Sequence, residues 1–365
     1  MDNMNKALRV AVFFVCVAGS NLLYAQAPKY SNEFLSIGVG ARALAMAGAQ
    51  VATVNDATSS FWNPAGLVNV KGHLQLALMH SAPFGGVAKY DYGSLAVPAD
   101  ATSTIGFSLI RLGVDDIPDT TELIDANGQV HWEKVKSFSI ADYGFFFTYS
   151  KNSKVVGFTY GGSAQVIHRT VGEFAKVWGC GIDLGSQYKK DKWSFGVMGK
   201  DVTSTFNAWT YNTEKFQNVF EITGNEIPKN SLEITLPKLI LGTAYTTPIS
   251  KKFGLTVAAD LDVTFDGQRN VVFSSDPVSI DPHAGFEIDY DQFLFFRGGV
   301  QNIQQIKDFD NTKYTVAQPN LGIGIKLKNL TIDYALTHVG GTSEALGTVY
   351  TNVFSLKLDI HKKPK

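Results

Sequence analysis

The sequence predicts an all-β protein, a transmembrane antiparallel β-barrel of about fourteen strands with an N-terminal hatch or plug segment. Short runs of the chain alternate between apolar and polar residues, and the connections between these runs are alternately long and hairpin-sized. No segment approaches the roughly 20 apolar residues that a membrane helix needs. Composition alone decides little, because 45% hydrophobic and 18% charged residues with a mean hydropathy of +0.00 also suit a soluble two-domain protein.

The first 25 residues predict export, as a signal peptide. Lys6 and Arg9 precede an apolar stretch, and cleavage near Ala25 would leave Gln26 as the new N-terminus. Cys16 lacks the small-residue context of a lipoprotein signal and would be removed, so Cys180 has no partner for an intrachain disulfide. The predicted location is the cell outer membrane, crossed by many strands.

Residues 26–72 do not follow the strand rhythm and are predicted to form the hatch. Residues 38–49 are rich in small side chains, and residues 56–62 suit one or two helical turns that end at Pro64. Residues 38–43 also match a loose nucleotide-binding pattern, G-x-G-x-x-A, but no convincing strand precedes them and no βαβ unit follows. We therefore interpret them as a place of close backbone packing, and expect no cofactor.

Residues 73–365 are predicted to form the barrel, with strands recognised by period-two alternation and β-branched or aromatic content. The expected strands are 73–80, 89–97, 103–111, 138–150, 154–168, 176–188, 193–200, 236–247, 253–264, 283–289, 292–300, 317–326, 330–338 and 350–360. The aromatic runs 145–147 and 293–296 are expected in the wall and its interfacial girdle.

The lengths of the connections favour a barrel over a β-sandwich. Six alternate connections are hairpin-sized, namely 98–102, 151–153, 189–192, 248–252, 290–291 and 327–329, whereas the others include the long stretches 112–137, 201–235, 265–282, 301–316 and 339–349. A sandwich has no reason to alternate loop lengths, but a barrel meets two different solvents. The hatch and the C-terminus are then expected in the periplasm, and the long loops outside.

Charge and motif content argue against several functional classes. The formal charge is −1, and removal of the signal peptide would leave −2, so nucleic acid is not an expected partner. The seven His residues show no metal-ligand spacing, and no G-x-S-x-G motif occurs, so neither a metal site nor an enzyme is predicted. Asp260 and Asp262 share one face of a strand, and lipid would penalise them, so they are expected to face the lumen.

The two longest loops are acidic, with six acidic residues against two Lys in 112–137 and five against two in 201–235. They could select basic or polar protein partners, or their charges could simply keep the loops solvated. The short turns and their borders carry lysine instead, at positions 151, 189, 190, 192, 251, 252, 326 and 328.

Several segments resemble one protein family. These are Gly40-Ala41-Arg42, the stretch 56–67 with Asn63-Pro64-Ala65, residues 111–120, Phe206-Asn207-Ala208-Trp209, and residues 223–228. They are similar to the PorV/PorQ family, relatives of the FadL fatty-acid transporters; the Asn-Pro-Ala segment is shared with the wider FadL group. The chain departs from many barrels in continuing past its last strand with residues 361–365 instead of ending on an aromatic residue.

The resemblance implies an outer-membrane component of the type IX secretion system of Bacteroidota-like bacteria. PorV-type members bind the C-terminal domains of secreted cargo and pass them to other secretion components for surface attachment. Candidate hatch or gate residues are Arg42, Asp56, Phe61, Trp62, Asn63 and Pro64, and candidate partner-binding loop residues are Asp115, Asp116, Asp119, Phe206, Trp209 and Glu226. The alternatives are a FadL-like channel for hydrophobic small molecules and, less directly supported, a surface adhesin carried by the loops.

Overall fold

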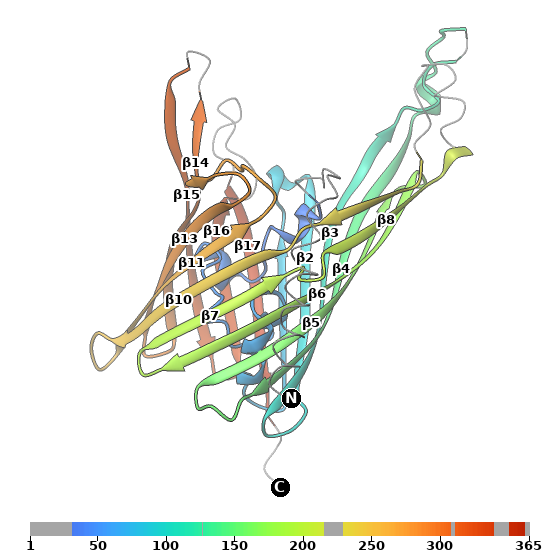
Figure 1. Cartoon of the computed structure of the whole chain (residues 1–365). Helices are drawn as coiled ribbons and strands as arrows, with labels where there is room; N and C mark the ends of the chain where they lie inside the picture. Colours follow the sequence, from blue (N-terminus) through green and yellow to red (C-terminus); the bar gives the residue numbers. More distant parts are fainter. Residues whose placement is uncertain (1–30, 126, 215–228, 308–310, 339–349, 362–365) are drawn as a thin grey trace, which may run out of the picture.

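The computed structural model describes residues 31–125, 127–214, 229–307, 311–338 and 350–361. Its strands all belong to one antiparallel sheet that closes on itself, since β1 pairs with both β2 and β17 (Figure 1). They are β1 (Leu74–Ser81), β2 (Ala88–Pro98), β3 (Ser103–Asp119), β4 (Lys136–Asn152), β5 (Phe158–Val171), β6 (Ala175–Lys190), β7 (Trp193–Lys200), β8 (Thr205–Tyr211), β9 (Ser231–Thr235), β10 (Lys238–Pro248), β11 (Phe253–Thr264), β12 (Phe273–Ser274), β13 (Ser279–Tyr290), β14 (Leu294–Lys307), β15 (Lys313–Leu327), β16 (Leu330–His338) and β17 (Tyr350–Ile360).

Among the described residues these strands fill fourteen positions in the wall, which confirms the predicted barrel. β7 and β8 are two parts of one wall strand, because β6 pairs with both. β9 and β10 likewise share a position beside them. The two-residue β12 adds only to the start of β13.

The predicted loops were too long in four places. Residues 201–235 contain β8 and β9, and residues 112–137 contain the end of β3 and the start of β4. Residues 265–282 contain β12 and the start of β13, and residues 301–316 contain the end of β14 and the start of β15. The alternation is broken at Asp201 and Ser204, whose φ values of 54° and 55° are left-handed, and at Pro237, which has no N–H to donate. Local pattern alone therefore does not show that β8 and β9 continue the wall.

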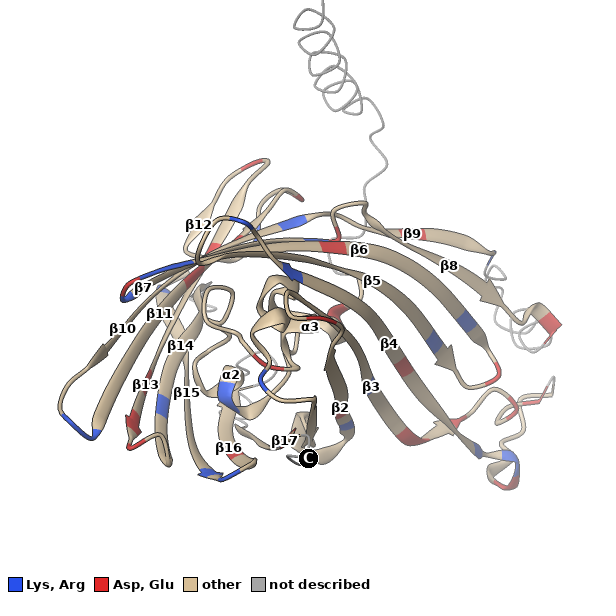
Figure 2. Cartoon of the chain, turned by 90° about the horizontal axis from the view of Figure 1, so that it is seen from below, with Lys and Arg blue, Asp and Glu red and all other residues tan. Residues whose placement is uncertain are grey.

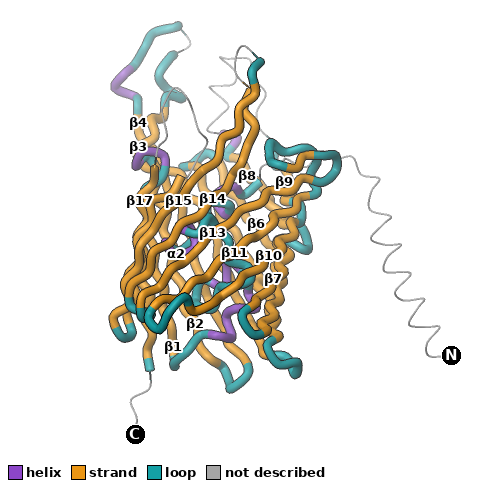
Figure 3. The backbone as a smooth tube through the Cα atoms, turned by 90° about the vertical axis from the view of Figure 1, so that its left-hand side faces the viewer, coloured by secondary structure: helices purple, strands orange, loops and turns teal. Residues whose placement is uncertain are grey.

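The two ends of the barrel differ as expected. The β3–β4 and β14–β15 hairpins rise above the rest of the wall, whereas the connections at the opposite end are short (Figure 1). The tube view shows the inclined strands with the larger loops at one end (Figure 3). β17 ends at Ile360 beside the start of β1, on the short-turn side.

The wall presents apolar side chains to the outside, as contact with lipid requires. In β6, Trp178, Ile182 and Leu184 are exposed on the outer face, and Val177 and Asp183 are buried on the inner face. Of the aromatic runs, Phe147 and Phe296 face outward, whereas Phe146 and Phe295 are buried. No helix among the described residues is long and apolar enough to span a bilayer.

Residues 31–72, hereafter the luminal segment, lie inside the ring of strands (Figure 2). The segment forms η2 (Glu33–Leu35), α2 (Ala41–Ala45), α3 (Ser59–Trp62) and η3 (Pro64–Asn69). Its apolar side chains build the largest core cluster with inward-facing residues of the wall, including Phe61 with Phe146 and Ile110. The predicted signal peptide lies outside the described residues.

Candidate functional site

The luminal segment is seated by direct contact with the backbone of the wall. A side-chain carbon at Gly185 of β6 would come within 2.0 Å of the Asn63 amide oxygen, and one at Gly285 of β13 within 2.4 Å of the Met46 carbonyl. Glycine is needed where the strand backbone is approached so closely, by a side chain at Gly185 and by backbone at Gly285. The segment therefore occupies the lumen in one fixed register against the strands.

Asn63 and Pro64 form a corner of the luminal segment. The Asn63 side-chain oxygen accepts a hydrogen bond from the Ala65 amide, and its Nδ2 donates to the carbonyls of Val51 and Ser186 at 2.9 and 3.1 Å. Asn63 is fully buried, and Pro64 occupies the first position of η3. One amide thus caps a helix, closes a turn and ties the segment to β6.

Arg42 connects α2 to β13 of the wall. Its guanidinium binds both carboxylate oxygens of Glu287 in β13, at 2.8 and 3.2 Å. Glu287 also accepts from Arg297 of β14 at 2.6 Å, and Arg297 donates to Asp333 of β16 at the same distance. Burial alone would lower the pKa of Arg42, but the neighbouring Glu287 carboxylate outweighs it and holds that pKa above its ordinary value.

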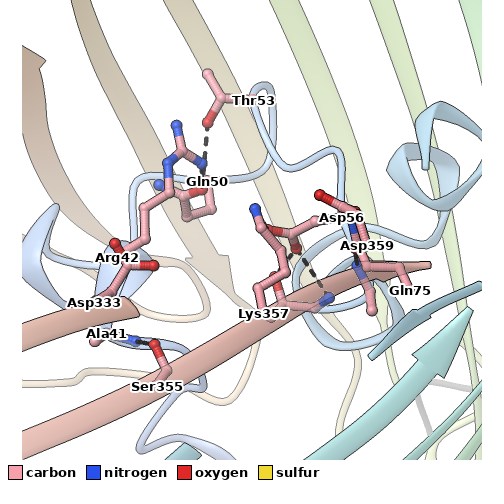
Figure 4. Close-up of polar contacts among 12 residues, drawn as sticks. Ala41, Arg42, Gln50, Thr53, Asp56, Gln75, Asp333, Ser355, Lys357 and Asp359 are labelled. Atoms are coloured by element: carbon pink, nitrogen blue, oxygen red, sulfur yellow. Dashed lines mark hydrogen bonds and ion pairs between the residues drawn. The ribbon is translucent and has the colours of Figure 1, made fainter. Parts of the chain in front are cut away.

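Asp56 forms the second anchor, toward the last strand. Its carboxylate accepts from the Lys357 ammonium at 2.9 Å and from the amide and hydroxyl of Thr58 at 3.0 and 2.6 Å. Figure 4 shows Asp56 and Lys357 turned toward one another, with Gln75 and Asp359 beside them. Burial alone would raise the pKa of Asp56, but Lys357 and the Thr58 hydroxyl hold it well below its usual value.

Phe61 and Trp62 form an aromatic face of the segment. Phe61 is buried, lies 5.0 Å from Trp62 between ring centroids and faces the Lys200 ammonium at 4.2 Å. The Trp62 indole N–H donates to the Val39 carbonyl at 2.8 Å. Both rings line a cavity of about 590 Å³ inside the barrel, within the size range of small-molecule sites.

The cavity is amphipathic. The luminal segment supplies most of its apolar lining, including Phe34, Leu35 and Leu44, and the strands supply charged and polar groups, including Lys238, Asp262 and His283. Asp262 accepts from Lys238 at 2.6 Å and contacts His283 at 3.2 Å, and Asp260 accepts from the amides of Gln50 and Val51 at 2.8 and 2.9 Å. Both aspartates thus face inward, as predicted.

The hatch candidates therefore come together in the lumen, although Arg42 binds β13 and Asp56 binds β17. Three strand residues were missed: Glu287, which binds Arg42, Lys357, which binds Asp56, and Asp333, which binds Arg297. A signal existed, because each is a single charge between two outward-facing apolar residues of a strand, as in Phe286-Glu287-Ile288. Among the described residues no three His, Cys, Asp or Glu side chains are arranged to hold a metal ion.

The loop candidates do not form one cluster. Asp115 and Asp116 lie at a bulge in the part of β3 beyond the predicted strand, where Asp115 pairs with Lys89 at 2.9 Å. Asp119 accepts from the Thr121 amide and hydroxyl where β3 ends. Phe206 and Trp209 lie in β8 of the wall, and the Trp209 indole donates to Glu233 at 2.8 Å. Glu226 lies outside the described residues.

Comparison with known proteins identifies the architecture. No protein-family model and no curated protein matches the sequence. Among solved structures, the chain is similar to the CymD monoaromatic hydrocarbon channel, with 13% identity and a TM-score of 0.55 over 89% of this chain and 98% of the other.

The fold is FadL-like.

Two further structures support the same assignment of fold. The Pseudomonas putida toluene transporter TodX is 14% identical, with a TM-score of 0.55 over 90% of this chain and 100% of the other. A Pseudomonas aeruginosa FadL homologue is 13% identical, with a TM-score of 0.52 over 87% of this chain and 97% of the other. At such low sequence identity, the similarity to these structures establishes only the fold, and the function has to be argued from the site.

Proposed function

We propose that the protein is a non-enzymatic outer-membrane channel for hydrophobic small molecules. The cavity beneath the long-loop end carries this proposal, because Phe61 and Trp62 give it an aromatic face large enough for a small apolar ligand. The similar structures include a monoaromatic hydrocarbon channel and a toluene transporter, whose ligands would suit such a cavity. This alternative now ranks above the secretion function that the sequence resemblance suggested.

The luminal segment is the proposed hatch. Its two ion-paired anchors, Arg42 to Glu287 and Asp56 to Lys357, hold it across the lumen below the cavity. A ligand in the cavity contacts the aromatic face of the segment directly, so ligand binding and displacement of the segment act on the same residues. The ion pairs of the two anchors make the lumen below the cavity polar. An apolar ligand would therefore stay in the cavity, because moving past the anchors would place it among charged groups.

Uptake of labelled toluene by cells tests the proposal. Cells that carry the protein in their outer membrane should take up toluene faster than cells with an empty vector, and Trp62→Ala should change that rate. Trp178→Ala is the matched control, since Trp178 is 58% exposed on the outer face of the wall. Equal uptake with and without the protein, for toluene and for a panel of other apolar probes, would reject the channel.

A PorV-like role in type IX secretion is the second candidate. The family-like segments favour it, together with the acidic β3–β4 hairpin that projects from the long-loop end (Figure 1). Secreted cargo C-terminal domains and other secretion components are its proposed partners. Deletion of the gene in its native strain, with all type IX cargo still secreted and anchored normally, would remove this candidate.

A further inference from the structure

Lysine is concentrated on one arc of the short-turn end of the barrel. The turns β4–β5, β6–β7 and β10–β11 follow one another around the wall, because β5 pairs with β6 and β7 with β10. Together with the adjoining strand ends they carry seven lysines and one acidic residue, Asp191; the lysines are Lys151, Lys154, Lys189, Lys190, Lys192, Lys251 and Lys252. We call these seven lysines the basic rim, and two of its turns appear beside β7 and β10 in Figure 2.

The ammonium groups of the basic rim are not used inside the protein. Within the described part of the chain none of the seven lies within ion-pair distance of a carboxylate, whereas Lys238 and Lys357 of the lumen each do. Lys192 donates one hydrogen bond to the Thr247 hydroxyl at 2.9 Å. Six of the seven side chains are exposed, and Lys151 is half-buried. The remaining donors are therefore free for an external anion.

Aromatic rings place this charge at the edge of the apolar wall. The Lys192 ammonium lies 5.9 Å from the ring of Tyr245, which contacts Trp193 at 4.9 Å between centroids. One turn further, Lys252 lies 5.8 Å from Tyr290, which contacts Phe253 at 5.1 Å. The arrangement is thus repeated, with a turn lysine, the aromatic residue after it, and a tyrosine of the next wall strand.

The depth of these rings identifies the partner. Trp193 and Phe253 are exposed on the outer face, directly below the apolar residues that contact lipid. Tyr and Trp prefer the level of the lipid headgroups, and lysine stems extend along apolar surface to reach it. Lysines at this level attract anionic headgroups electrostatically. A periplasmic protein partner would have no reason to require lysines beside Tyr245 and Tyr290, at the edge of the lipid-facing surface.

We infer that the basic rim binds the phosphate groups of anionic phospholipids in the periplasmic leaflet of the outer membrane. Of the other short turns, β2–β3 carries Asp100 and β13–β14 carries Asp289 and Asp291, without lysine, and only β15–β16, away from this arc, carries a lysine pair, Lys326 and Lys328. The inference rests on the outer-membrane location in the proposed function and on the expected orientation, with the short turns in the periplasm. It does not rest on transport. A failure of toluene uptake therefore leaves it intact, and lipid binding is measured without transport.

Native mass spectrometry of the purified full chain tests the inference. The protein is incubated in detergent with equimolar phosphatidylglycerol and phosphatidylcholine of identical acyl chains, and the bound lipids are counted. The wild type should retain phosphatidylglycerol in preference. K251Q/K252Q should weaken that preference by roughly fivefold for each lysine removed. K134Q/K136Q, which removes two lysines at the long-loop end, should leave it unchanged.

Equal retention of the two lipids by the wild type would overturn the inference, as would an unchanged preference in K251Q/K252Q. An equal loss in the control pair would also overturn it, since net charge alone would then explain binding. A second measurement needs no variant, because thermal unfolding of the wild type in bilayers should shift upward when phosphatidylglycerol is added to phosphatidylcholine. No shift would contradict a specific headgroup site.

Discussion

Asp56 of the luminal segment and Lys357 of the last strand form an ion pair of 2.9 Å, although 301 positions separate them in the sequence. The contact joins the luminal segment to β17, the last strand of the barrel. It exists only when the barrel has closed with the segment inside, because β17 reaches its place beside β1 through that closure. The pair therefore reports on the seating of the hatch.

Replacement of Lys357 by Met should destabilise the folded protein by about 2 kcal/mol, because it leaves a buried carboxylate without its cation. This cost in stability is smaller than for a fully buried ion pair, because the Lys357 side chain is 23% exposed. The loss of stability is measured as the temperature at which the folded barrel unfolds and changes its mobility on a gel. The double variant Asp56→Asn with Lys357→Met should recover part of it, and a double variant no more stable than the single one would show that the pair itself is not responsible.

The same carboxylate predicts a pH dependence. The pKa of Asp56 lies below its ordinary value of 3.8, so its contribution to stability is fully present above that pH. The contribution is lost as the pH falls toward the folded-state pKa, because the unfolded chain binds the proton first. Thermal midpoints of the wild type and Asp56→Asn should thus differ at pH 7 and converge in acid. A constant difference between them would contradict the assignment.

The strands were predictable because period-two alternation is a local property. β6 and β17 show this alternation directly, because residues two positions apart lie on the same face and adjacent residues lie on opposite faces. β8 and β9 were not, because left-handed residues at Asp201 and Ser204 and the proline at position 237 interrupt the pattern. Pairing with β6 restores β8 to the wall, and that pairing is a tertiary contact.

The luminal half of the site was predictable and the wall half was not. Arg42, Asp56, Asn63 and Pro64 stand in the segments that resemble the PorV/PorQ family, and Asn63 and Pro64 also have recognisable turn chemistry. Their partners are set by strand register across the closed barrel, and Glu287 lies 245 positions from Arg42. A charge in the inward phase of a strand shows that a luminal partner is needed, but only the fold shows which one it is.

Gly185→Ala should unseat the luminal segment. The new methyl carbon would lie 2.0 Å from the Asn63 amide oxygen. That oxygen accepts from Ala65, and the amide nitrogen of the same side chain donates to Val51 and Ser186, so the side chain is held in place. Overpacking of this kind costs about 1–3 kcal/mol. Gly93→Ala is the control, because its methyl would meet only Leu78 at 3.6 Å, on the outer face. Unfolding midpoints should fall for Gly185→Ala alone; equal midpoints in both variants would refute the tight contact.

Arg297 should matter more for stability than Arg42, although both bind Glu287. Arg297 is 2% exposed and is held between Glu287 and Asp333, so Arg297→Met leaves Asp333 without a cation and should cost about 3–5 kcal/mol. Arg42→Met leaves Glu287 paired with Arg297, and the more exposed Arg42 should cost only about 1–2 kcal/mol. Denaturant unfolding in detergent gives both values. The reverse order would mean that the anchor on the luminal segment, and not the wall pair, carries this network.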